Sequence, residues 1–426
     1  MKHFYSKFLS LSFAVAGFVL TSAQYSNGYI VANEGNYGSP TGEISYIDAN
    51  NNVTNNVYHL ANNDEALGDI LQSIYFNGDK SYLVLNNSNK VVVTNRASFV
   101  KSAEITNNIV QPRYTTIANG KIYTSNWGTS SAHVSVHNAT TLAYITSIPL
   151  SENPEEIVTV NGKVYVNKSS YRAGNSIEVI DPSTDTIIKT ITLSSGLQSI
   201  TVIGNDIFAL CTGLTGSTVY KINTTTDTVA ASIANATVVP PSDYEALKFT
   251  SDATKLYIAG VTSVYSLNTD LATFSSTPIF TTTPSTSYGD FYGFAAIDGK
   301  IFQGNANSFG PSSTVNVYSL TGTLLNTFST TIGANNVYKN LFTPANLAIA
   351  ENKLSNAISI YPNPVSDVLY IKNADAASYQ IVDISGKLVK AGTYKNGIAI
   401  SDLNKGAYII QISVKNTQKT EKFIVK

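Results

Sequence analysis

The sequence predicts an all-β protein, in which a seven-bladed β-propeller is followed by a small C-terminal β-sandwich. Three observations support this fold class. A phrase of four short strands recurs along most of the chain, charged residues are few (13%) while tyrosines are many (26), and the repeat stops before a lysine-rich segment of different pattern. We therefore divide the 426 residues into segments 1–23, 24–352 and 353–426.

The first segment has the pattern of a secretory signal peptide. Lys2 and Lys7 precede an apolar run from Phe8 to Leu20, and the small residues up to Ala23 suit a signal peptidase. The run is shorter than the ~20 residues needed to span a bilayer. No cysteine lies near the cleavage site, so we expect cleavage after Ala23 without a lipid anchor.

The second segment contains seven copies of the repeat, of which Pro154 to Leu193 is the clearest. In that copy four strands with alternating apolar and polar residues are separated by turn residues. Forty-odd residues per four strands is typical of a propeller blade, and seven copies can close a ring. The second strand of each copy carries one aromatic or apolar anchor; the anchors are Val31, Tyr82, Tyr123, Tyr165, Phe208, Tyr257 and Phe302, separated by 51, 41, 42, 43, 49 and 45 residues.

The two ends of this segment complement each other. The copy that begins at Gly28 lacks an inner strand ahead of it, whereas the apolar segment Asn336 to Ala350 follows the last complete copy. The late segment can fill the early vacancy, which would remove the exposed sheet edges of an open array. We predict that blade 1 is shared between the two ends; a solenoid of stacked β-coils is the alternative.

Charge and cysteine content exclude several functions. Residues 24–352 hold fifteen Lys or Arg and twenty-three acidic residues, a net charge of −8, and the three arginines (Arg96, Arg113, Arg172) are not clustered. A nucleic-acid partner is therefore not expected, because binding to phosphates needs a basic stripe. The single cysteine, Cys211, stands in an apolar strand and is predicted to be a buried thiol.

A ligand site is expected on one face of the ring. Loops between second and third strands, and loops that lead to the next inner strand, share that face around the central channel. Their aromatic rings are Tyr37, Trp127, Tyr171, Tyr244, Tyr288, Phe291, Tyr292 and Phe309, beside Arg113 and Arg172. Flat rings with an amide fringe suit a large, partly apolar, hydrogen-bonding ligand such as a tetrapyrrole or a glycan; the alternative is that rings wedge neighbouring blades apart.

The sequence motifs offer little support for a catalytic site or a metal site. His133 and His137 stand on one predicted strand, four residues apart, which is too far for shared metal ligation. The acidic pairs Asp64-Glu65 and Glu155-Glu156 are interpreted as solvated turn carboxylates rather than a glycosidase pair. Asp185 and Asp227 begin Asp-Thr-Ile and Asp-Thr-Val phrases that suit turns and also resemble a short O-glycosylation sequon. We expect no catalytic residue, no metal and no cofactor.

The third segment reads as a compact β-sandwich, with short strands separated by Gly, Asn and Asp turns. Its motifs are Tyr361-Pro362-Asn363-Pro364, the turn from Asp383 to Lys387 with Gly386, Gly406-Ala407-Tyr408 and the terminal Lys422 to Lys426. In that order they resemble the type A C-terminal sorting domain of the type IX secretion system of Bacteroidetes. The resemblance implies a partner, the type IX secretion machinery, and a location that is secreted or on the outer cell surface, reached through the periplasm.

The repeat phrases, such as Lys121 to Asn126 and Ser176 to Ile191, resemble YVTN or YncE-like propellers, and the stretch from Asn33 to Asp48 resembles a surface subgroup of Bacteroidetes. That subgroup includes cobalamin-binding propellers that cap TonB-dependent transporters. The resemblance implies capture of a corrinoid or similar nutrient, with a transporter as partner, although this chain has a sorting domain where those proteins have a lipid. An adhesion module for proteins or glycans is the second hypothesis, and a lyase-type propeller the third.

Overall fold

The computed structural model describes residues 25–169, 173–240, 246–285, 287–342, 359–373, 377–383, 387–414 and 417–426. The expected signal peptide 1–23 and the expected domain boundary at 352/353 lie outside these residues. The chain divides into two compact units, residues 1–343 and 344–426. Among the described helices, none is long and apolar enough to span a bilayer.

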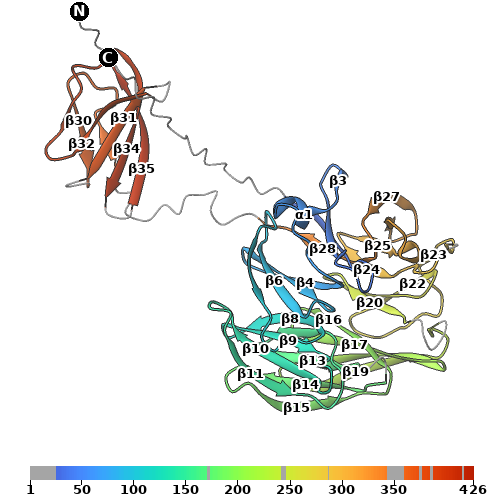
Figure 1. Ribbon diagram of the computed structural model, residues 1–426. Coiled ribbons are helices and arrows are strands. Elements are labelled where there is room, and N and C mark those ends of the chain that lie inside the picture. The colour runs from blue at the N-terminus through green and yellow to red at the C-terminus, as the bar shows by residue number, and fades with distance from the viewer. Residues whose placement is uncertain are drawn as a thin grey trace, which may run out of the picture. The chain divides into compact units, whose positions relative to one another are not determined.

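Within the described part of the first unit, the strands form seven four-stranded antiparallel sheets, which are arranged in a ring (Figure 1). The prediction of a seven-bladed propeller is therefore confirmed. Blade 1 contains β28 (Ala334–Asn340), β1 (Gly28–Asn33), β2 (Glu43–Ile47) and β3 (Val53–Thr54), and helix α1 (Val57–Ala61) leads to blade 2. Blade 2 contains β4 (Leu71–Asn77), β5 (Lys80–Leu85), β6 (Lys90–Asn95) and β7 (Lys101–Ile105).

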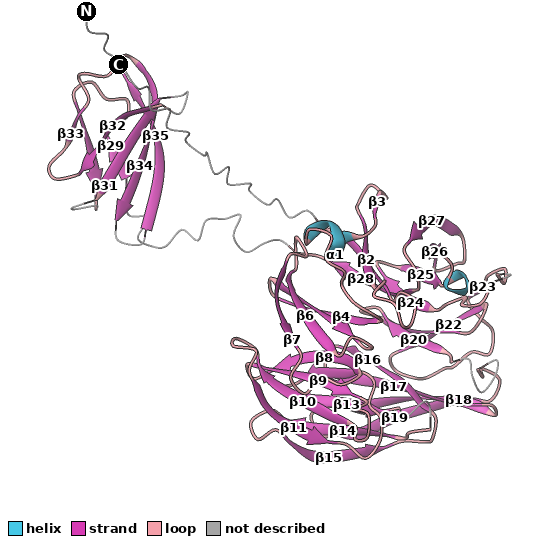
Figure 2. Cartoon of the chain, viewed as in Figure 1, coloured by secondary structure: helices cyan, strands magenta, loops and turns pink. Residues whose placement is uncertain are grey.

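The next three blades follow one another in chain order, each from its inner to its outer strand (Figure 2). Blade 3 contains β8 (Pro112–Ala118), β9 (Lys121–Asn126), β10 (His133–Asn138) and β11 (Tyr144–Pro149). Blade 4 contains β12 (Ile157–Val160), β13 (Lys163–Lys168), β14 (Ser176–Asp181) and β15 (Thr186–Thr192). Blade 5 contains β16 (Leu197–Ile203), β17 (Asp206–Gly213), β18 (Gly216–Asn223) and β19 (Thr228–Asn235).

The last two blades complete the ring. Blade 6 contains β20 (Lys248–Ser251), β21 (Lys255–Ala259), β22 (Ser263–Asn268) and β23 (Phe280–Thr281). Blade 7 contains β24 (Gly293–Ile297), β25 (Lys300–Asn305), the short 3-10 helix η2 (Asn307–Phe309), β26 (Ser313–Ser319) and β27 (Leu324–Thr330). All seven predicted anchors lie in the second strand of their blade and are at most 1% exposed, because they fill the layers between neighbouring blades.

The ring closes where the sequence predicts. β28 pairs with β1 in antiparallel register, with Tyr29 opposite Lys339 and Val31 opposite Val337. The Asn340 amide strengthens this closure, because it donates to the Tyr25 carbonyl oxygen at 2.7 Å and accepts from Arg96 Nε at 2.7 Å. The inner strand of blade 1 therefore comes from the other end of the propeller sequence.

A repeated polar contact joins neighbouring blades. Asp227, in the turn between β18 and β19, accepts from Lys163 Nζ at 2.6 Å and from the Tyr165 hydroxyl at 2.5 Å, both from β13 of the preceding blade. Asp185 makes the same contacts with Lys121 and Tyr123, one blade earlier. Both aspartates occupy turns, as predicted, with φ of 54° and 56°. The outer turn of one blade is thus fixed to the anchor strand of the previous one.

The second unit is built from seven described strands: β29 (Ser359–Tyr361), β30 (Val368–Lys372), β31 (Ser378–Asp383), β32 (Leu388–Thr393), β33 (Ile398–Ala399), β34 (Gly406–Val414) and β35 (Thr417–Val425). These described strands form a three-stranded sheet, β29-β30-β33, and a four-stranded sheet, β32-β31-β34-β35. A single apolar cluster, which includes Leu369, Ile381, Ile410 and Phe423, fills the space that both sheets share. The predicted C-terminal β-sandwich is consistent with this arrangement.

Candidate functional site

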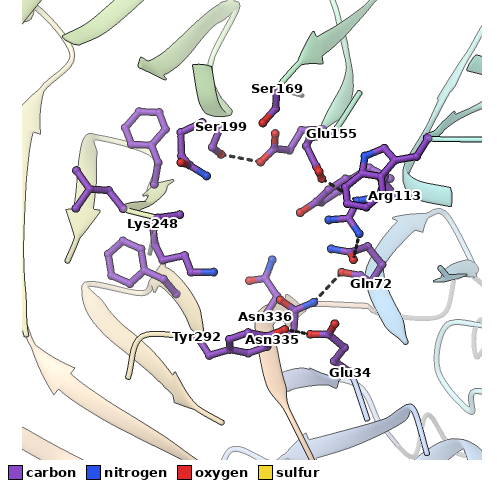
Figure 3. Close-up of a pocket in the computed structure, with 18 residues that line it drawn as sticks. Glu34, Gln72, Arg113, Glu155, Ser169, Ser199, Lys248, Tyr292, Asn335 and Asn336 are labelled. Carbon is purple, nitrogen blue, oxygen red and sulfur yellow. Dashed lines mark hydrogen bonds and ion pairs between the residues drawn. The ribbon is translucent and has the colours of Figure 1, made fainter. Parts of the chain in front are cut away.

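The principal cavity of the described residues opens in the central channel and has a volume of about 640 Å³ (Figure 3). Such a volume lies within the range typical of small-molecule sites. Every blade contributes to its wall. The lining residues are Glu34, Gln72, Arg113, Tyr114, Trp127, Glu155, Glu156, Ser169, Gln198, Ser199, Ala246, Leu247, Lys248, Phe249, Tyr292, Phe294, Asn335 and Asn336.

The lining comes from the parts of the blades that the sequence places on one face. Gln72, Arg113 and Ser199 stand at the beginnings of inner strands β4, β8 and β16, and Trp127 follows the second strand β9. Neighbouring inner strands pack side by side, so residues at their starts converge on the channel. The cavity therefore lies at the channel mouth on the loop face.

Arg113 is the centre of the most elaborate cluster in the cavity. Its Nε donates to Glu155 at 2.9 Å, its Nη1 donates to the Gln72 side-chain oxygen, and its guanidinium lies 4.1 Å from the centre of the Trp127 ring. The indole Nε1 donates to the Pro154 carbonyl oxygen at 2.9 Å. Three blades thereby hold a cation and an aromatic face in one fixed orientation.

Glu156 is beside this cluster and is held by two donors. The Ser199 hydroxyl donates to it at 2.7 Å and the Asn167 amide at 2.5 Å. Burial, with the neighbouring charge of Glu155 as a second cause, raises the pKa of Glu156 to about 7. The interpretation of Glu155-Glu156 as solvated carboxylates is therefore wrong, because the inner strand β12 begins at the channel rather than in solvent. Asp64 and Glu65, by contrast, are exposed.

The opposite wall carries Tyr292, Glu34 and Lys248. The Tyr292 hydroxyl donates a short hydrogen bond to Glu34, and burial raises the pKa of Glu34. Lys248 Nζ lies 5.2 Å from the centre of the Tyr292 ring, and burial lowers the pKa of this lysine. The cavity thus combines two cations and three acidic groups within a partly aromatic wall.

The structure brings together some of the expected ligand-binding residues. Arg113, Trp127 and Tyr292 line the cavity, and Phe309 lies behind Tyr292 in an edge-to-face contact at 5.1 Å. Tyr288 is 59% exposed and lines an adjoining pocket of about 250 Å³ that shares Lys248 and Tyr292 with the principal cavity. These residues form one continuous area of the loop face.

Other expected residues do not join this area. Tyr37 is 81% exposed on the loop that follows Glu34 and is outside the cavity lining. Phe291 was expected to project from its loop, but it is buried against Phe294 because it belongs to the core between blades 6 and 7. Tyr171, Arg172 and Tyr244 lie outside the described residues.

The aromatic residues of the loops did not predict most of the polar residues that line the cavity. The signal was present in the repeat, because the residue ten positions before each of six anchors lines the cavity. These residues are Gln72, Arg113, Glu155, Gln198, Leu247 and Tyr292, which precede Tyr82, Tyr123, Tyr165, Phe208, Tyr257 and Phe302. A search for polar residues at this fixed offset would also have pointed to the neighbouring Glu156, Ser199 and Lys248.

The histidines of the described propeller lie outside the cavity lining. His133 and His137 lie on β10, as predicted, where the Nε2 atoms contact the backbone carbonyl oxygens of Asn108 at 3.3 Å and Asn107 at 2.8 Å. Among the residues that the structure describes, no group of three or more His, Cys, Asp or Glu side chains is arranged to hold a metal. Cys211 is buried, as predicted, and burial raises the pKa of its thiol to about 11.

The expected sorting residues surround the terminal strand of the second unit. Asn363, between Pro362 and Pro364, donates to the Lys422 carbonyl oxygen at 2.9 Å and accepts from the Ile424 amide at 3.0 Å. The Tyr361 ring stacks on Tyr370 and is 51% exposed. Gly406 and Tyr408 begin β34, opposite Val425 and Phe423, whereas Gly386 lies outside the described residues. The first and last motifs of this unit are therefore in direct contact.

Comparison with protein families decides where the propeller belongs. Residues 27–300, more than half of the chain, match the family "Domain of unknown function (DUF5074)". The chain belongs to this family. No curated protein matches the chain. The matched residues end at the first residue of β25, so the rest of blade 7 and the closing strand β28 extend beyond the match.

Solved structures share the fold of this DUF5074 protein at low sequence identity. A quinonprotein alcohol dehydrogenase-like protein from Bacteroides thetaiotaomicron has a TM-score of 0.58 at 12% identity, over 74% of this chain and 79% of that one. A functionally unknown protein from Desulfotomaculum acetoxidans has a TM-score of 0.53 at 13% identity, over 74% of this chain and 98% of that one. A protein from Lactobacillus plantarum has a TM-score of 0.52 at 14% identity, over 73% of this chain and 98% of that one. At these identities the likeness shows the fold alone.

The C-terminal unit has its own family match. Residues 359–426 match the secretion system C-terminal sorting domain. This match confirms the predicted sorting domain and its implied partner, the type IX secretion machinery. The protein is therefore directed to secretion or to the outer cell surface by that system.

Proposed function

We propose that this exported DUF5074 propeller is a non-enzymatic capture protein, which binds a small nutrient molecule in the cavity at the mouth of its channel. A corrinoid is the first candidate. The observation that carries the proposal is the cavity of about 640 Å³, to which all seven blades contribute polar or aromatic side chains. A closed ring of strands holds those side chains in place without a ligand, and preorganisation of this kind lowers the cost of binding.

The chemistry of the wall supports a ligand that is partly apolar and rich in hydrogen-bonding groups. The amides of Gln72, Asn335 and Asn336 line the same cavity as the rings of Trp127 and Tyr292. A corrinoid has a broad ring with peripheral amide groups, so its ring would cover the mouth while its amides enter the cavity. Aromatic faces and amides are the groups that bind such a surface tightly.

Capture is favoured over catalysis because the acidic groups among the described lining residues are already hydrogen-bonded within the protein. Arg113 and Glu155 satisfy each other, and Glu156 and Glu34 each have donors within the protein. A lyase would need a histidine and an acid that face each other, and the described lining residues include no histidine. A TonB-dependent transporter, which would take the ligand onward, is the partner that this proposal implies.

Calorimetric titration of the mature chain with cyanocobalamin tests the proposal. We expect saturable binding that Trp127→Ala weakens at least about tenfold, because the ligand then loses an aromatic face. Tyr144→Ala is the matched control, since Tyr144 is a partly exposed aromatic residue of the same blade on the outer strand β11. Absence of binding heat with the unchanged protein would exclude the corrinoid.

A specific observation favours adhesion as a second candidate function. Exposed aliphatic side chains recur at the outer strands of several blades: Ile145 on β11, Ile188 on β15 and Leu324 on β27 are 44%, 52% and 53% exposed. A contiguous patch of such groups is typical of surfaces that bind other proteins. Replacing all three with serine should abolish attachment of the protein to host or bacterial surfaces if adhesion is its function, and should leave small-molecule binding unchanged.

A further inference from the structure

Lys248 differs from three other lysines of the propeller in its lack of an ion pair among the described residues. Lys121, Lys163 and Lys168 form ion pairs at 2.6 Å with Asp185, Asp227 and Glu178. Lys248 has no ion pair or side-chain hydrogen bond among the described residues, although it begins the inner strand β20 and projects into the principal cavity (Figure 3). Its ammonium group lies over the Tyr292 ring, 5.2 Å from the ring centre.

The acidic groups among the described lining residues are already engaged. Glu155 accepts from Arg113, Glu156 accepts from Ser199 and Asn167, and Glu34 accepts from Tyr292. Their attraction for Lys248 acts through space, not through a direct contact. The ammonium group therefore retains hydrogen-bond donors that are directed toward the cavity.

A partly buried ammonium group is unfavourable when, as among the described residues here, no side chain makes an ion pair or hydrogen bond with it. Removing a charge from water costs free energy that only a nearby counter-charge with hydrogen bonds can offset. Burial accordingly lowers the pKa of Lys248. A ligand that brings an anionic oxygen to this position would recover the lost interaction, so the site is more complementary to a charged ligand than to its neutral analogue.

We propose that Lys248 is the anion subsite of the cavity and receives a carboxylate or phosphate group of the ligand. The inference rests on the proposed function in that the cavity must admit a ligand, and it adds the chemical class of one group on that ligand. A phosphodiester of a corrinoid and a free carboxylate share this chemistry, and the experiment below separates them.

Anion binding at Lys248 is expected to be coupled to protonation of the neighbouring carboxyl groups. The charged or titratable groups that act on Lys248 are Glu34, Glu155, Glu156, Arg113 and Tyr292. Burial raises the pKa of both Glu34 and Glu156, that of Glu156 to about 7, and each carboxyl stops repelling an entering anion once it is protonated. Protonation of Lys248 is favoured in the same direction. Anion affinity should therefore increase as the pH falls through about 7.

The first experiment follows Lys248 itself in the full mature chain. Lysines are ¹³C-dimethylated, and the resonance of Lys248 is identified by its loss in Lys248→Arg. Titration with inorganic phosphate, and separately with acetate, should move this resonance and raise the pKa that it reports. If neither anion moves it, the proposal is overturned.

Variants show whether the charge matters for binding. Lys248→Met should weaken phosphate or acetate binding about tenfold or more, because the charged hydrogen bond to the anion is lost, whereas Lys248→Arg should retain much of the binding. Lys255→Met is the matched control, an exposed lysine that begins the next strand of the same blade. Equal affinity in Lys248→Met and the unchanged protein would contradict the proposal.

Corrinoids distinguish this inference from the proposed function. Cyanocobalamin carries a phosphodiester and dicyanocobinamide lacks it. Tighter binding of cyanocobalamin that is lost in Lys248→Met supports both ideas. Equal binding of both corrinoids, unchanged in Lys248→Met, supports corrinoid capture and overturns the anion subsite. Phosphate or acetate binding that depends on Lys248, without corrinoid binding, supports the subsite and excludes the corrinoid.

Discussion

The protonation of Glu156 illustrates how single residues set the properties of this cavity. Burial next to Glu155 raises its pKa to about 7, although the Ser199 hydroxyl and the Asn167 amide donate to it. Between pH 4.5 and about 7 the folded protein therefore binds a proton at Glu156 that the unfolded chain releases. Glu156 thus contributes stability that is greatest below its unfolded pKa and is lost as the pH rises through its folded pKa.

We predict that Glu156→Gln stabilises the propeller at about pH 8, by at most about 3 kcal/mol, and that this advantage fades toward about pH 5. The physical reason is that glutamine removes the cost of ionising a buried carboxyl. Urea denaturation, followed by the fluorescence of Trp127, the single tryptophan of the chain, measures the effect. Stability curves of variant and unchanged protein that stay parallel from pH 5 to pH 8 would contradict the prediction.

The residue scale is also where the sequence was least informative. Arg113, Trp127 and Tyr292 could be selected because an arginine and large rings in loops are unusual in a chain with three arginines and one tryptophan. Glu34 could not, because a single polar residue at a strand boundary resembles any solvated turn, and Lys248 could be found only from its place beside the fixed offset of the repeat. Only the convergence of seven inner strands makes such residues neighbours, and no local pattern encodes that convergence.

At the scale of elements, the contact of Asp227 with Lys163 and Tyr165 fixes one blade to the next. We predict that Asp227→Ala lowers the free energy of unfolding by about 2–4 kcal/mol, because it leaves a partly buried ammonium without its counter-charge. Asp185→Ala should act similarly in the neighbouring copy. Equilibrium denaturation in urea measures both changes.

Asp206→Ala is the matched control for these variants. Asp206 pairs with Lys221 at 3.0 Å, but both side chains are about one-third exposed, so the loss should be below about 1 kcal/mol. A loss at Asp227 as small as that at Asp206 would show that the contact between blades does not stabilise the ring.

Elements were predicted well where the repeat was regular. The anchors were correct because their apolar, aromatic pattern reflects burial between blades, which every copy shares. The long interval between Val31 and Tyr82 was not explained in advance; it accommodates helix α1 (Val57–Ala61), too short for a recognisable helical period. The two-residue outer strands β3 and β23 likewise give too little pattern to identify.

At the scale of the whole molecule, stability depends on β28 closing the ring. We predict that a mature chain ending at residue 342 folds, whereas one ending at residue 333 remains open and is degraded by protease. The missing strand would expose the edge of β1 and release Tyr25 and Arg96 from Asn340. Near-ultraviolet circular dichroism and limited proteolysis measure the difference.

Two further observations make this prediction specific. A synthetic peptide of residues 334–342 should restore protease resistance to the shorter chain, since it supplies the missing strand. Asn340→Ala in the full chain should cause a smaller loss, about 1–3 kcal/mol, because only the side-chain contacts disappear. Equal protease resistance of the chains ending at 333 and 342 would show that the ring does not need β28.

The position of β28 in the sequence also determines when blade 1 can be completed during synthesis. β1 emerges from the ribosome about three hundred residues before its partner, so blade 1 stays incomplete until the propeller sequence is almost finished. The sorting domain follows that closing strand. A chain terminated anywhere before residue 334 therefore lacks both its closing strand and its export tag, so every polypeptide that bears the tag has already received the strand that completes its ring.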